Sequence, residues 1–275
     1  MLPFRKYHGA GNDFVCVDDR GGDFSHLSEP ATIAALCERH YGIGADGLIL
    51  LRTDPSAADG LGLRMVYYNS DGQPSSFCGN GSRCFLAFAL ELGLLGAPEC
   101  GGDAPSAIEF EANDGRHRGE VLAPDRYRVS MRVAGRVSRL ADADDRVETG
   151  SPHFVRWCGE LPEGDITTAA RAIRYAPAFA KTGINVNFVA TEGKGLAIRT
   201  YERGVESETQ ACGTGVTAAA LSFAERRALE GTQEVRVRAL GGDLLVRFRR
   251  ARGGEVSDVT LEGPAERVFG GVWGA

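Results

Sequence analysis

Short apolar runs recur along the first half of the chain and are separated by glycine-rich and polar turns. Runs of this length, rich in Val, Ile, Phe and Tyr, are typical of β-strands. The pattern predicts strands at Phe14–Val17, Leu48–Leu51, Leu63–Tyr68, Ile108–Ala112 and Tyr127–Val133.

Two segments between these runs have helical length and composition. In "SEPATIAALCERHYG" we expect Ser28 to cap a helix, Pro30 to lie in its first turn and Gly42 to end it. A second helix is predicted over Ser82–Leu92 and ends at Gly93. The buried face of the first helix is expected to carry Ile33, Leu36 and Cys37.

The second half of the chain repeats this order. "NVNFVAT" from Asn185 resembles "GNDFVCVD" from Gly11, and "LAIRTYERGVESETQACGTG" resembles "LRMVYYNSDGQPSSFCGNG". Each longer segment ends in a four-residue motif that begins with a cysteine, Cys78 or Cys212, and has glycine at its second and fourth positions. A helix is predicted after each cysteine. We infer a diverged internal duplication. It predicts two pseudo-symmetric α+β domains whose cysteines face each other across a cleft. The acidic stretch "ADADDRVETG" is the expected linker.

Composition excludes several classes of function. A net charge of −6 argues against a nucleic-acid or anionic-membrane partner. No signal-peptide core or run of 18 apolar residues is visible, so we expect a cytoplasmic protein. Seven cysteines without a C-x-x-C pair fit neither a disulfide framework nor a zinc site. Only Lys6, Lys181 and Lys194 could form a Schiff base, which disfavours covalent pyridoxal chemistry.

Cys78 and Cys212 point to proton-transfer chemistry. The start of a helix favours both a thiolate and a bound carboxylate. Two such sites facing each other would place an acid and a base on opposite sides of one carbon, an arrangement that suits racemisation without a metal or cofactor. We expect the other cysteines to be structural: Cys16, Cys37, Cys84, Cys100 and Cys158.

Amide side chains gather in the duplicated segments, and they suit a ligand that carries both carboxylate and ammonium groups. Arg203 either binds a second carboxylate through two hydrogen bonds or is a surface charge, and Glu202 could hold an ammonium group. His153 either tunes the thiols or is a core histidine. The asparagines in question are Asn12, Asn69, Asn80, Asn185 and Asn187, of which Asn80 and Asn187 could instead be turn or cap residues.

Motifs through almost the whole chain resemble the diaminopimelate epimerase family: "KYHGAGNDFV", "RHYGIGADGL", "FCGNGSRC", "GSPH", "INVNF", "YERGVESETQACGTG" and "EGPAERVFGG". The resemblance implies that Cys78 and Cys212 are the catalytic acid/base pair and that Glu202 and His153 tune the thiols and hold an ammonium group. It places the substrate among Asn12, Asn69, Ser151, Asn185 and Arg203, with hydrogen bonds from Gly79, Asn80, Gly213 and Thr214 at the helix starts.

The resemblance also implies a fold and an assembly. Each domain is expected to be a curled, mostly antiparallel sheet around a central helix, with the final strand returning to the first domain. The expected domains are residues 1–122 with 262–275, and residues 123–261. A homodimer without a cofactor is implied. The chain departs from the family at Ser151, where asparagine is usual, at Gly47, where some members have glutamine, and by one extra residue between Arg203 and Cys212.

These observations together favour epimerisation of LL-2,6-diaminopimelate to the meso form, in lysine and peptidoglycan-precursor synthesis. Two alternatives stay open. One is a racemase or isomerase of the same superfamily that acts on a smaller amino or hydroxy acid. The other is a non-catalytic switch in which the two cysteines form a reversible disulfide.

Overall fold

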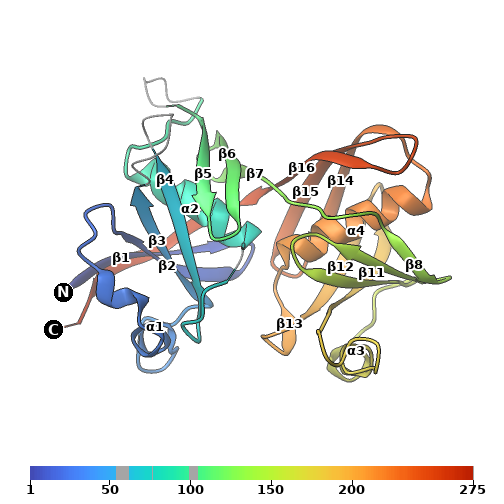
Figure 1. The fold of residues 1–275 in the computed structure, drawn as a ribbon, viewed down its shortest axis with the longest axis horizontal. Helices are drawn as coiled ribbons and strands as arrows, with labels where there is room; N and C mark the ends of the chain where they lie inside the picture. Colours follow the sequence, from blue (N-terminus) through green and yellow to red (C-terminus); the bar gives the residue numbers. More distant parts are fainter. Residues whose placement is uncertain (54–61, 76, 99–104, 275) are drawn as a thin grey trace. The chain divides into compact units, whose positions relative to one another are not determined.

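The computed structural model describes residues 1–53, 62–75, 77–98 and 105–274, which form four α-helices and seventeen strands. The chain divides into two compact units, Met1–Val129 with Gly263–Ala275, and Ser130–Glu262 (Figure 1). This confirms the predicted α+β class. No helix among the described residues is long and apolar enough to cross a bilayer.

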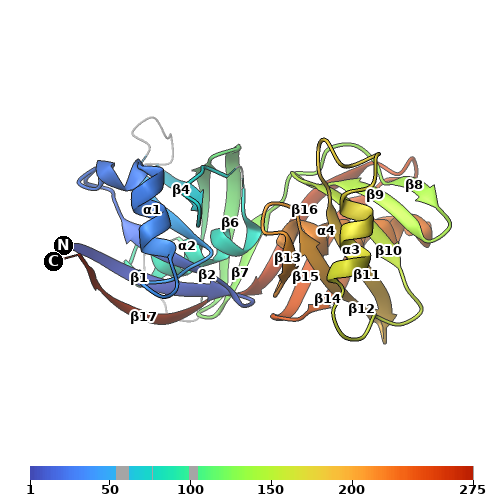
Figure 2. The same ribbon diagram turned by 90° about the horizontal axis from the view of Figure 1, so that it is seen from below.

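The first unit curls its strands around one long helix. The helices of this unit are α1 (Pro30–Cys37) and α2 (Gly79–Glu91), preceded by a short 3-10 turn at Ser25–Ser28. Helix α2 is buried from Gly79 to Ala89 and contacts strands of this unit on several sides (Figure 2). The strands are β1 (Leu2–Gly9), β2 (Asn12–Asp18), β3 (Gly47–Thr53), β4 (Leu63–Asn69), β5 (Ala107–Ala112), β6 (Gly115–Ala123), β7 (Arg126–Ser130) and β17 (Glu266–Trp273).

The second unit has the same plan. Its central helix is α4 (Gly213–Arg226), which contacts strands on several sides, and its short helix is α3 (Thr167–Arg174). Each long helix therefore forms the centre of its own unit. The strands are β8 (Ser138–Ala141), β9 (Asp144–Glu148), β10 (Pro152–Trp157), β11 (Asn185–Glu192), β12 (Gly195–Glu202), β13 (Ser207–Thr209), β14 (Gly231–Ala239), β15 (Gly242–Arg250) and β16 (Val256–Pro264).

The short helices cover the outer faces of the sheets. Ile33 and Leu36 of α1 pack in one apolar cluster with Val15 and Val17 of β2. Ala170 and Ile173 of α3 pack likewise with Val186 and Phe188 of β11. Because these sheets have helices on both faces, neighbouring residues of a strand are buried alike, which explains the continuous apolar runs in the sequence.

Strand pairing brings distant segments together within each unit. In the first unit, β1 lies between β2 and β17, so the two ends of the chain lie side by side (Figure 1). Strands β2 and β3 are parallel, and Gly47 of β3 lies opposite Asn69 of β4. In the second unit, β10 and β11 are parallel, and His153 pairs in register with Asn185.

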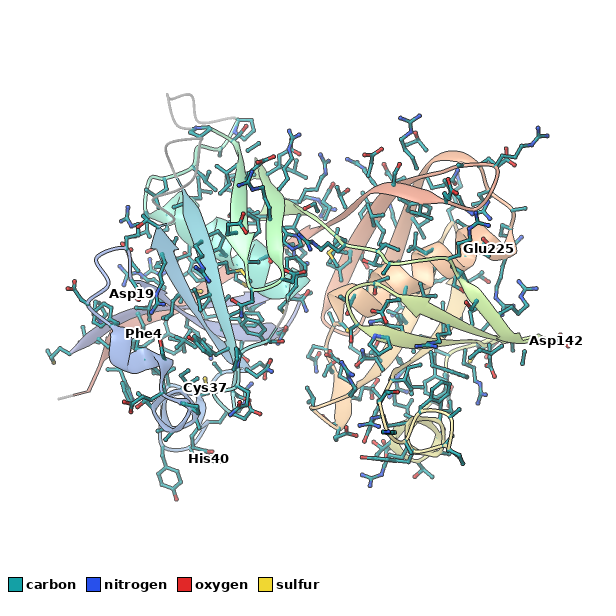
Figure 3. All side chains as sticks on the ribbon, viewed as in Figure 1. Phe4, Asp19, Cys37, His40, Asp142 and Glu225 are labelled. Carbon is teal, nitrogen blue, oxygen red and sulfur yellow. The ribbon has the colours of Figure 1, made fainter. Side chains whose placement is uncertain are left out.

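The first predicted helix is shorter than its pattern suggested. Its N-cap is Glu29 rather than Ser28, without a side-chain capping bond, and it ends at Cys37 rather than at Gly42. Glu38 adopts an extended conformation, and the N–H of Gly42 returns to the Glu38 carbonyl. The predicted apolar face is confirmed, and Figure 3 shows Cys37 at the end of this helix.

The acidic segment at residues 141–150 is not a linker. It contains β9, which pairs with β10 inside the second unit, and Asp145 of β9 is fully buried. The structure passes between units after Val129 rather than after residue 122, because β7 pairs with β6 of the first unit. The predicted strand at Tyr127–Val133 ends at Ser130.

Candidate functional site

Cys78 is the N-cap of α2, and the residues after it form the first helical turn. Its backbone is extended, and its Sγ accepts a hydrogen bond of 3.3 Å from the N–H of Gly81. The Ser82 N–H donates to the Cys78 carbonyl at 2.8 Å, which begins the helix. The thiol therefore lies where the N–H groups and the helix dipole favour negative charge.

Two of the predicted asparagines join Cys78 in a hydrogen-bonded chain. Asn80 Nδ2 donates to Asn12 Oδ1 at 3.2 Å, and the Cys78 thiol lies 3.8 Å from that same oxygen. Asn12 Nδ2 in turn donates to the Asp46 carboxylate at 2.6 Å. On the other side, the Arg83 guanidinium donates to Asn80 Oδ1 at 2.8 Å. A carboxylate and a guanidinium, one at each end, thus set the orientation of both amides.

Asn69 lies at the end of β4 and is not part of this row of hydrogen-bonded side chains. Its Oδ1 accepts from the Tyr67 hydroxyl at 2.9 Å. Gly47 faces it across the strand pair, and a Cβ added to Gly47 would lie 2.4 Å from the Tyr68 carbonyl oxygen. The backbone here leaves no room for the glutamine that some family members carry at this position.

Cys212 occupies the equivalent place in the second unit, as the N-cap of α4. Its backbone is extended, its side chain makes no capping bond, and its Sγ lies 3.4 Å from Thr214 Oγ1. Thr149, which the sequence did not single out, donates through Oγ1 to the Thr214 carbonyl at 2.9 Å. Both cysteines therefore lie at loop-to-helix junctions, as predicted.

His153 lies beside the start of α4 and is fully buried. Burial lowers its pKa to about 3, and the nearby Arg203 charge adds to this, against a hydrogen bond from Asn187. Asn187 Nδ2 donates to His153 Nδ1 at 3.1 Å and to the Phe154 carbonyl at 2.9 Å. The imidazole is therefore neutral at physiological pH, with its proton on Nε2. Among the described residues, nothing accepts a hydrogen bond from this Nε2.

Glycine is required where α4 meets this pair. A Cβ added to Gly215 would lie 2.5 Å from Asn187 Oδ1 and 3.4 Å from His153 Cε1. That oxygen also accepts from the Thr200 hydroxyl at 3.0 Å. The second glycine of the "CGTG" motif thus lets the helix start pack directly against the buried amide and imidazole.

The remaining predicted residues of the second unit lie at or next to the ends of strands β10, β11 and β12. Asn185 Nδ2 donates to Ser151 Oγ at 2.8 Å, and Asn185 Oδ1 accepts from the Arg203 N–H at 2.9 Å. The Arg203 side chain is exposed and donates to the Thr182 carbonyl. Glu202 accepts from the Thr209 hydroxyl at 2.6 Å.

The other described cysteines lie away from the helix starts. Cys16, Cys37 and Cys84 are buried, and Cys158 is half-buried. Burial raises the pKa of each, to about 12 for Cys37. They stay protonated at neutral pH, as structural thiols do. Cys100 lies outside the described residues.

Arg83, Asp46 and Thr149 are polar contacts of the candidate site that the sequence reasoning missed. A signal for Arg83 was present, since it is the one charged residue between Gly79 and Leu90. Asp46 lies within the quoted motif "RHYGIGADGL" but was not singled out there, and Thr149 carried no such signal because it lies in a loop among other polar residues.

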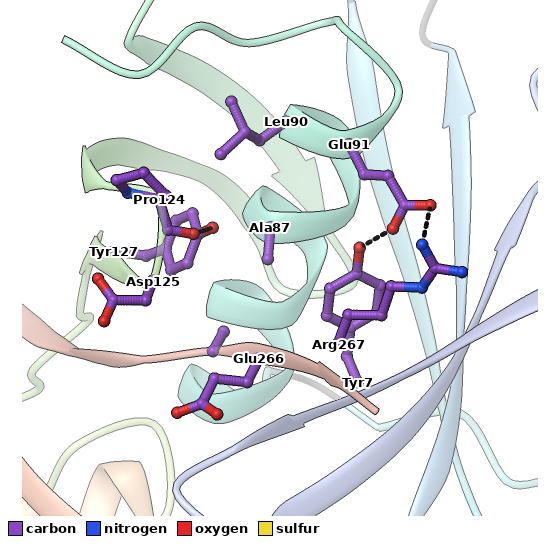
Figure 4. Close-up of a pocket in the computed structure, with 10 residues that line it drawn as sticks. Tyr7, Ala87, Leu90, Glu91, Pro124, Asp125, Tyr127, Glu266 and Arg267 are labelled. Carbon is purple, nitrogen blue, oxygen red and sulfur yellow. Dashed lines mark hydrogen bonds and ion pairs between the residues drawn. The ribbon is translucent and has the colours of Figure 1, made fainter. Parts of the chain in front are cut away.

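A pocket of about 320 Å³ lies elsewhere in the first unit, at the C-terminal end of α2 (Figure 4). The Glu91 carboxylate borders it and accepts hydrogen bonds from Tyr7 and Arg5. Cys78 caps the opposite end of this helix, and Ala87 of the pocket lies about 14 Å along the axis from it. The pocket is therefore separate from the thiol.

Solved structures with this fold include proteins of several activities. A phenazine biosynthesis protein of the PhzF family from Bacillus anthracis matches with a TM-score of 0.68 at 12% identity, over 98% of this chain and 97% of its own. A probable proline racemase from Agrobacterium radiobacter matches with a TM-score of 0.67 at 14% identity, over 100% and 93%. These likenesses show the two-unit fold alone.

Sequence comparison is more specific. Residues 4–115 and 146–268 match the sequence profile of the diaminopimelate epimerase family. The diaminopimelate epimerase of Flavobacterium psychrophilum is 38% identical over 265 residues, 96% of this chain and 97% of the relative. That of Chlorobaculum tepidum is 38% identical over 277 residues, 96% and 98% respectively. With both cysteine motifs inside the matched segments, the chain belongs to the diaminopimelate epimerase family.

Proposed function

We propose that this chain is an isomerase that converts LL-2,6-diaminopimelate to the meso form by removing a proton from one α-carbon and returning one to the opposite face. Cys78 and Cys212 are the two acid/base groups, one as thiolate and the other as thiol. The observation that carries this proposal is the repeated placement of a thiol as N-cap of a buried central helix, once in each unit. The chemistry needs no metal and no cofactor.

The helix starts also suit the substrate's carboxylate. An α-helix leaves the N–H groups of its first turn without intrahelical partners, and these groups favour anions. In this proposal the carboxylate beside the reacting carbon binds there, and the same groups stabilise the negative charge that develops as the proton leaves. The residues assigned to this role are Gly79, Asn80, Gly213 and Thr214.

Other polar side chains recognise the rest of the substrate in this proposal. The amides of Asn12, Asn69 and Asn185 and the hydroxyl of Ser151 can each bond either carboxylate or ammonium groups. Arg203 binds the distal carboxylate, and its exposed side chain is available for that role. Glu202 binds an ammonium group. The neutral His153, whose Nε2–H is buried at the start of α4, donates to the Cys212 thiolate or to the substrate.

A longer substrate distinguishes this proposal from its nearest rival, a racemase for a smaller amino or hydroxy acid. Diaminopimelate carries a second carboxylate and a second ammonium group, and the number of amides together with Arg203 suits it. The second unit holds Asn185, Ser151 and the Arg203 backbone in one hydrogen-bonded group. We also propose a cytoplasmic homodimer that supplies lysine and peptidoglycan-precursor synthesis.

Direct assay of the reduced protein tests this function. Incubation with LL-diaminopimelate should yield the meso isomer, as followed by chiral chromatography, whereas L-proline and trans-4-hydroxy-L-proline should stay unchanged. Arg203→Gln should raise KM for diaminopimelate. Turnover of proline but not of diaminopimelate would contradict the proposed substrate but would agree with the proposed two-thiol proton transfer. Inversion of none of these by folded, reduced protein would contradict both.

A further inference from the structure

Three buried polar residues are hydrogen-bonded across neighbouring strands of the second unit. His153 lies on β10, Asn187 on β11 and Thr200 on β12, and none is more than 3% exposed. Asn187 is central: its NH₂ donates to His153 Nδ1 at 3.1 Å, and its oxygen accepts from the Thr200 hydroxyl at 3.0 Å. Burial of polar groups costs free energy unless each finds a partner.

The register of the strands gives the equivalent positions in the first unit. Strands β2 and β3 are parallel and β3 pairs with β4, just as β10 and β11 are parallel and β11 pairs with β12. The first residue of β3 pairs with Phe14, and the first residue of β11 pairs with His153. Two residues further along, Ile49 of β3 corresponds to Asn187 of β11. Both Phe14 and Ile49 are fully buried.

The contacts of the central helices agree with this correspondence. A Cβ added to Gly81 of α2 would lie 3.3 Å from Ile49 Cδ1, and one added to Gly215 of α4 would lie 2.5 Å from Asn187 Oδ1. Each glycine is the third residue after the cysteine that caps its helix. An apolar side chain thus serves the packing of helix on sheet in the first unit. Packing alone therefore does not explain the amide and the imidazole of the second unit.

The hydrogen bonds of Asn187 fix the orientation of its amide. The NH₂ also donates to the Phe154 carbonyl at 2.9 Å, and a carbonyl oxygen can only accept. Turning the amide over would place two oxygens against each other. Asn187 therefore presents a donor to His153 Nδ1. With both of its N–H groups engaged inside the protein, this amide orients the imidazole rather than a ligand.

This donor determines which ring nitrogen of His153 carries the proton. Nδ1 must stay unprotonated to accept from Asn187, so the proton of the neutral ring lies on Nε2. A second proton would set Nδ1–H against the amide NH₂, and both burial and the nearby Arg203 charge oppose it as well. Within the part of the chain that the structure describes, the buried Nε2 has no hydrogen-bond partner.

The imidazole borders the same helix turn as Cys212. His153 Cε1, the ring atom bonded to Nε2, lies 3.4 Å from the place that a Cβ on Gly215 would take, and Cys212 Cβ lies 3.3 Å from it. A buried N–H group without an acceptor costs free energy, and this cost is recovered when an anion forms beside it. The Nε2–H group is therefore a donor held ready at the start of α4.

We propose that Asn187 is a positioning residue that holds His153 as the Nε2–H tautomer, so that this histidine donates a hydrogen bond to the Cys212 thiolate and does not act as the base for the Cys212 thiol. The inference rests on the proposed two-thiol function. When Cys212 gives its proton to the α-carbon, the electron pair of the carbanion forms the C–H bond and the S–H pair stays on sulfur. Nε2–H then bonds that thiolate and keeps its own proton.

Nitrogen NMR of the free protein tests the tautomer. With ¹⁵N-labelled histidine, two-bond proton–nitrogen spectra distinguish protonated from unprotonated ring nitrogens, and His153→Phe identifies the His153 signals by their loss. Near neutral pH we expect a proton on Nε2 and none on Nδ1. A proton on Nδ1 instead, or an equal mixture, would overturn the role of Asn187, and protons on both nitrogens would show that His153 does act as a base. No substrate is present, so this result does not depend on turnover of diaminopimelate.

Asn187→Asp tests the cause, because it replaces the donor that faces Nδ1 with an acceptor. The variant should carry a proton on His153 Nδ1, and kcat for diaminopimelate should fall by about 10²–10³-fold, as for loss of a donor to a developing anion. A folded variant without a proton on Nδ1 would overturn the proposal. Thr200→Val is the matched control on the next strand and should keep the proton on Nε2, because the Phe154 carbonyl still orients the amide.

Asn187→Ile introduces the residue that holds the equivalent place in the first unit, so this variant should fold. Without the amide donor, part of the protein should carry the proton on His153 Nδ1, and kcat should fall less than in Asn187→Asp. A folded isoleucine variant with the kcat of the unsubstituted protein would contradict a positioning role. If neither variant folds, the spectrum of the unsubstituted protein still decides.

Discussion

Cys78→Ala and Cys212→Ala should each lower kcat for diaminopimelate epimerisation by roughly 10²–10⁴-fold, the usual contribution of a general acid or base. Both losses are expected because the reaction needs a base on one face of the α-carbon and an acid on the other. The double variant should lose little more than the singles, since the two groups act as a unit.

The two single variants should differ in unfolding free energy although they lose similar activity. Cys78 accepts the Gly81 N–H as an N-cap, whereas Cys212 makes no capping bond. Cys78→Ala should therefore lose about 0.5–2 kcal/mol of unfolding free energy, and Cys212→Ala less. Cys158→Ala is the matched control, because this thiol is half-buried and lies away from both helix starts. A cysteine-to-alanine variant at either helix start with activity equal to this control would contradict the proposed pair.

Asp145→Ala should lower the unfolding free energy of the second unit by about 3–5 kcal/mol. Asp145 is fully buried and accepts hydrogen bonds from Arg226 at 2.6 and 3.0 Å and from Ser222 at 2.5 Å. The Ser222 hydroxyl also accepts from Trp157 at 2.8 Å. Removal of the carboxylate leaves the Arg226 charge without its partner, and it loosens the contact between β9 and the end of α4.

Asp144 provides the matched control on the same strand. Its carboxylate pairs with Arg156 at 2.8 Å, but this pair is partly exposed. Asp144→Ala should cost about 0–1 kcal/mol because solvent screens such pairs. Urea unfolding of both variants measures the difference. Comparable losses for the two aspartates would show that burial of Asp145 does not give the network its stability.

The same aspartate shows why part of the fold could not be predicted from sequence. The segment around Asp145 is acidic and suggested a linker, but Arg226, its partner, lies 81 residues away along the chain. Strand β1 was missed because Lys6 interrupts its apolar residues, although Lys6 is itself buried, with an ion pair to Asp13 and a hydrogen bond to the Gly44 carbonyl. Long-range pairing of charges is invisible to a pattern of apolar and polar positions.

Local motifs predicted more of the candidate site than of the fold around it. The "CGNG" and "CGTG" segments correctly indicated helix starts, although α2 begins at Gly79 rather than at Ser82. Glycine has a low helix propensity, so the sequence suggested a loop where burial of the first turn makes a helix. The burial of Arg83, and the lack of a partner for His153 Nε2 among the residues that the structure describes, follow from packing, and only the structure shows them.

The central claim is that two different thiols act on opposite faces of one α-carbon, and isotope incorporation during the first few per cent of turnover tests it most directly. Reduced protein and LL-diaminopimelate are mixed in D₂O, and substrate and product are separated and analysed by mass spectrometry. The account predicts one deuterium in each meso product and almost none in the recovered LL substrate, because the donating thiol carries a solvent deuteron. Protium retained in the product, or equal deuterium in substrate and product, would contradict a two-thiol mechanism.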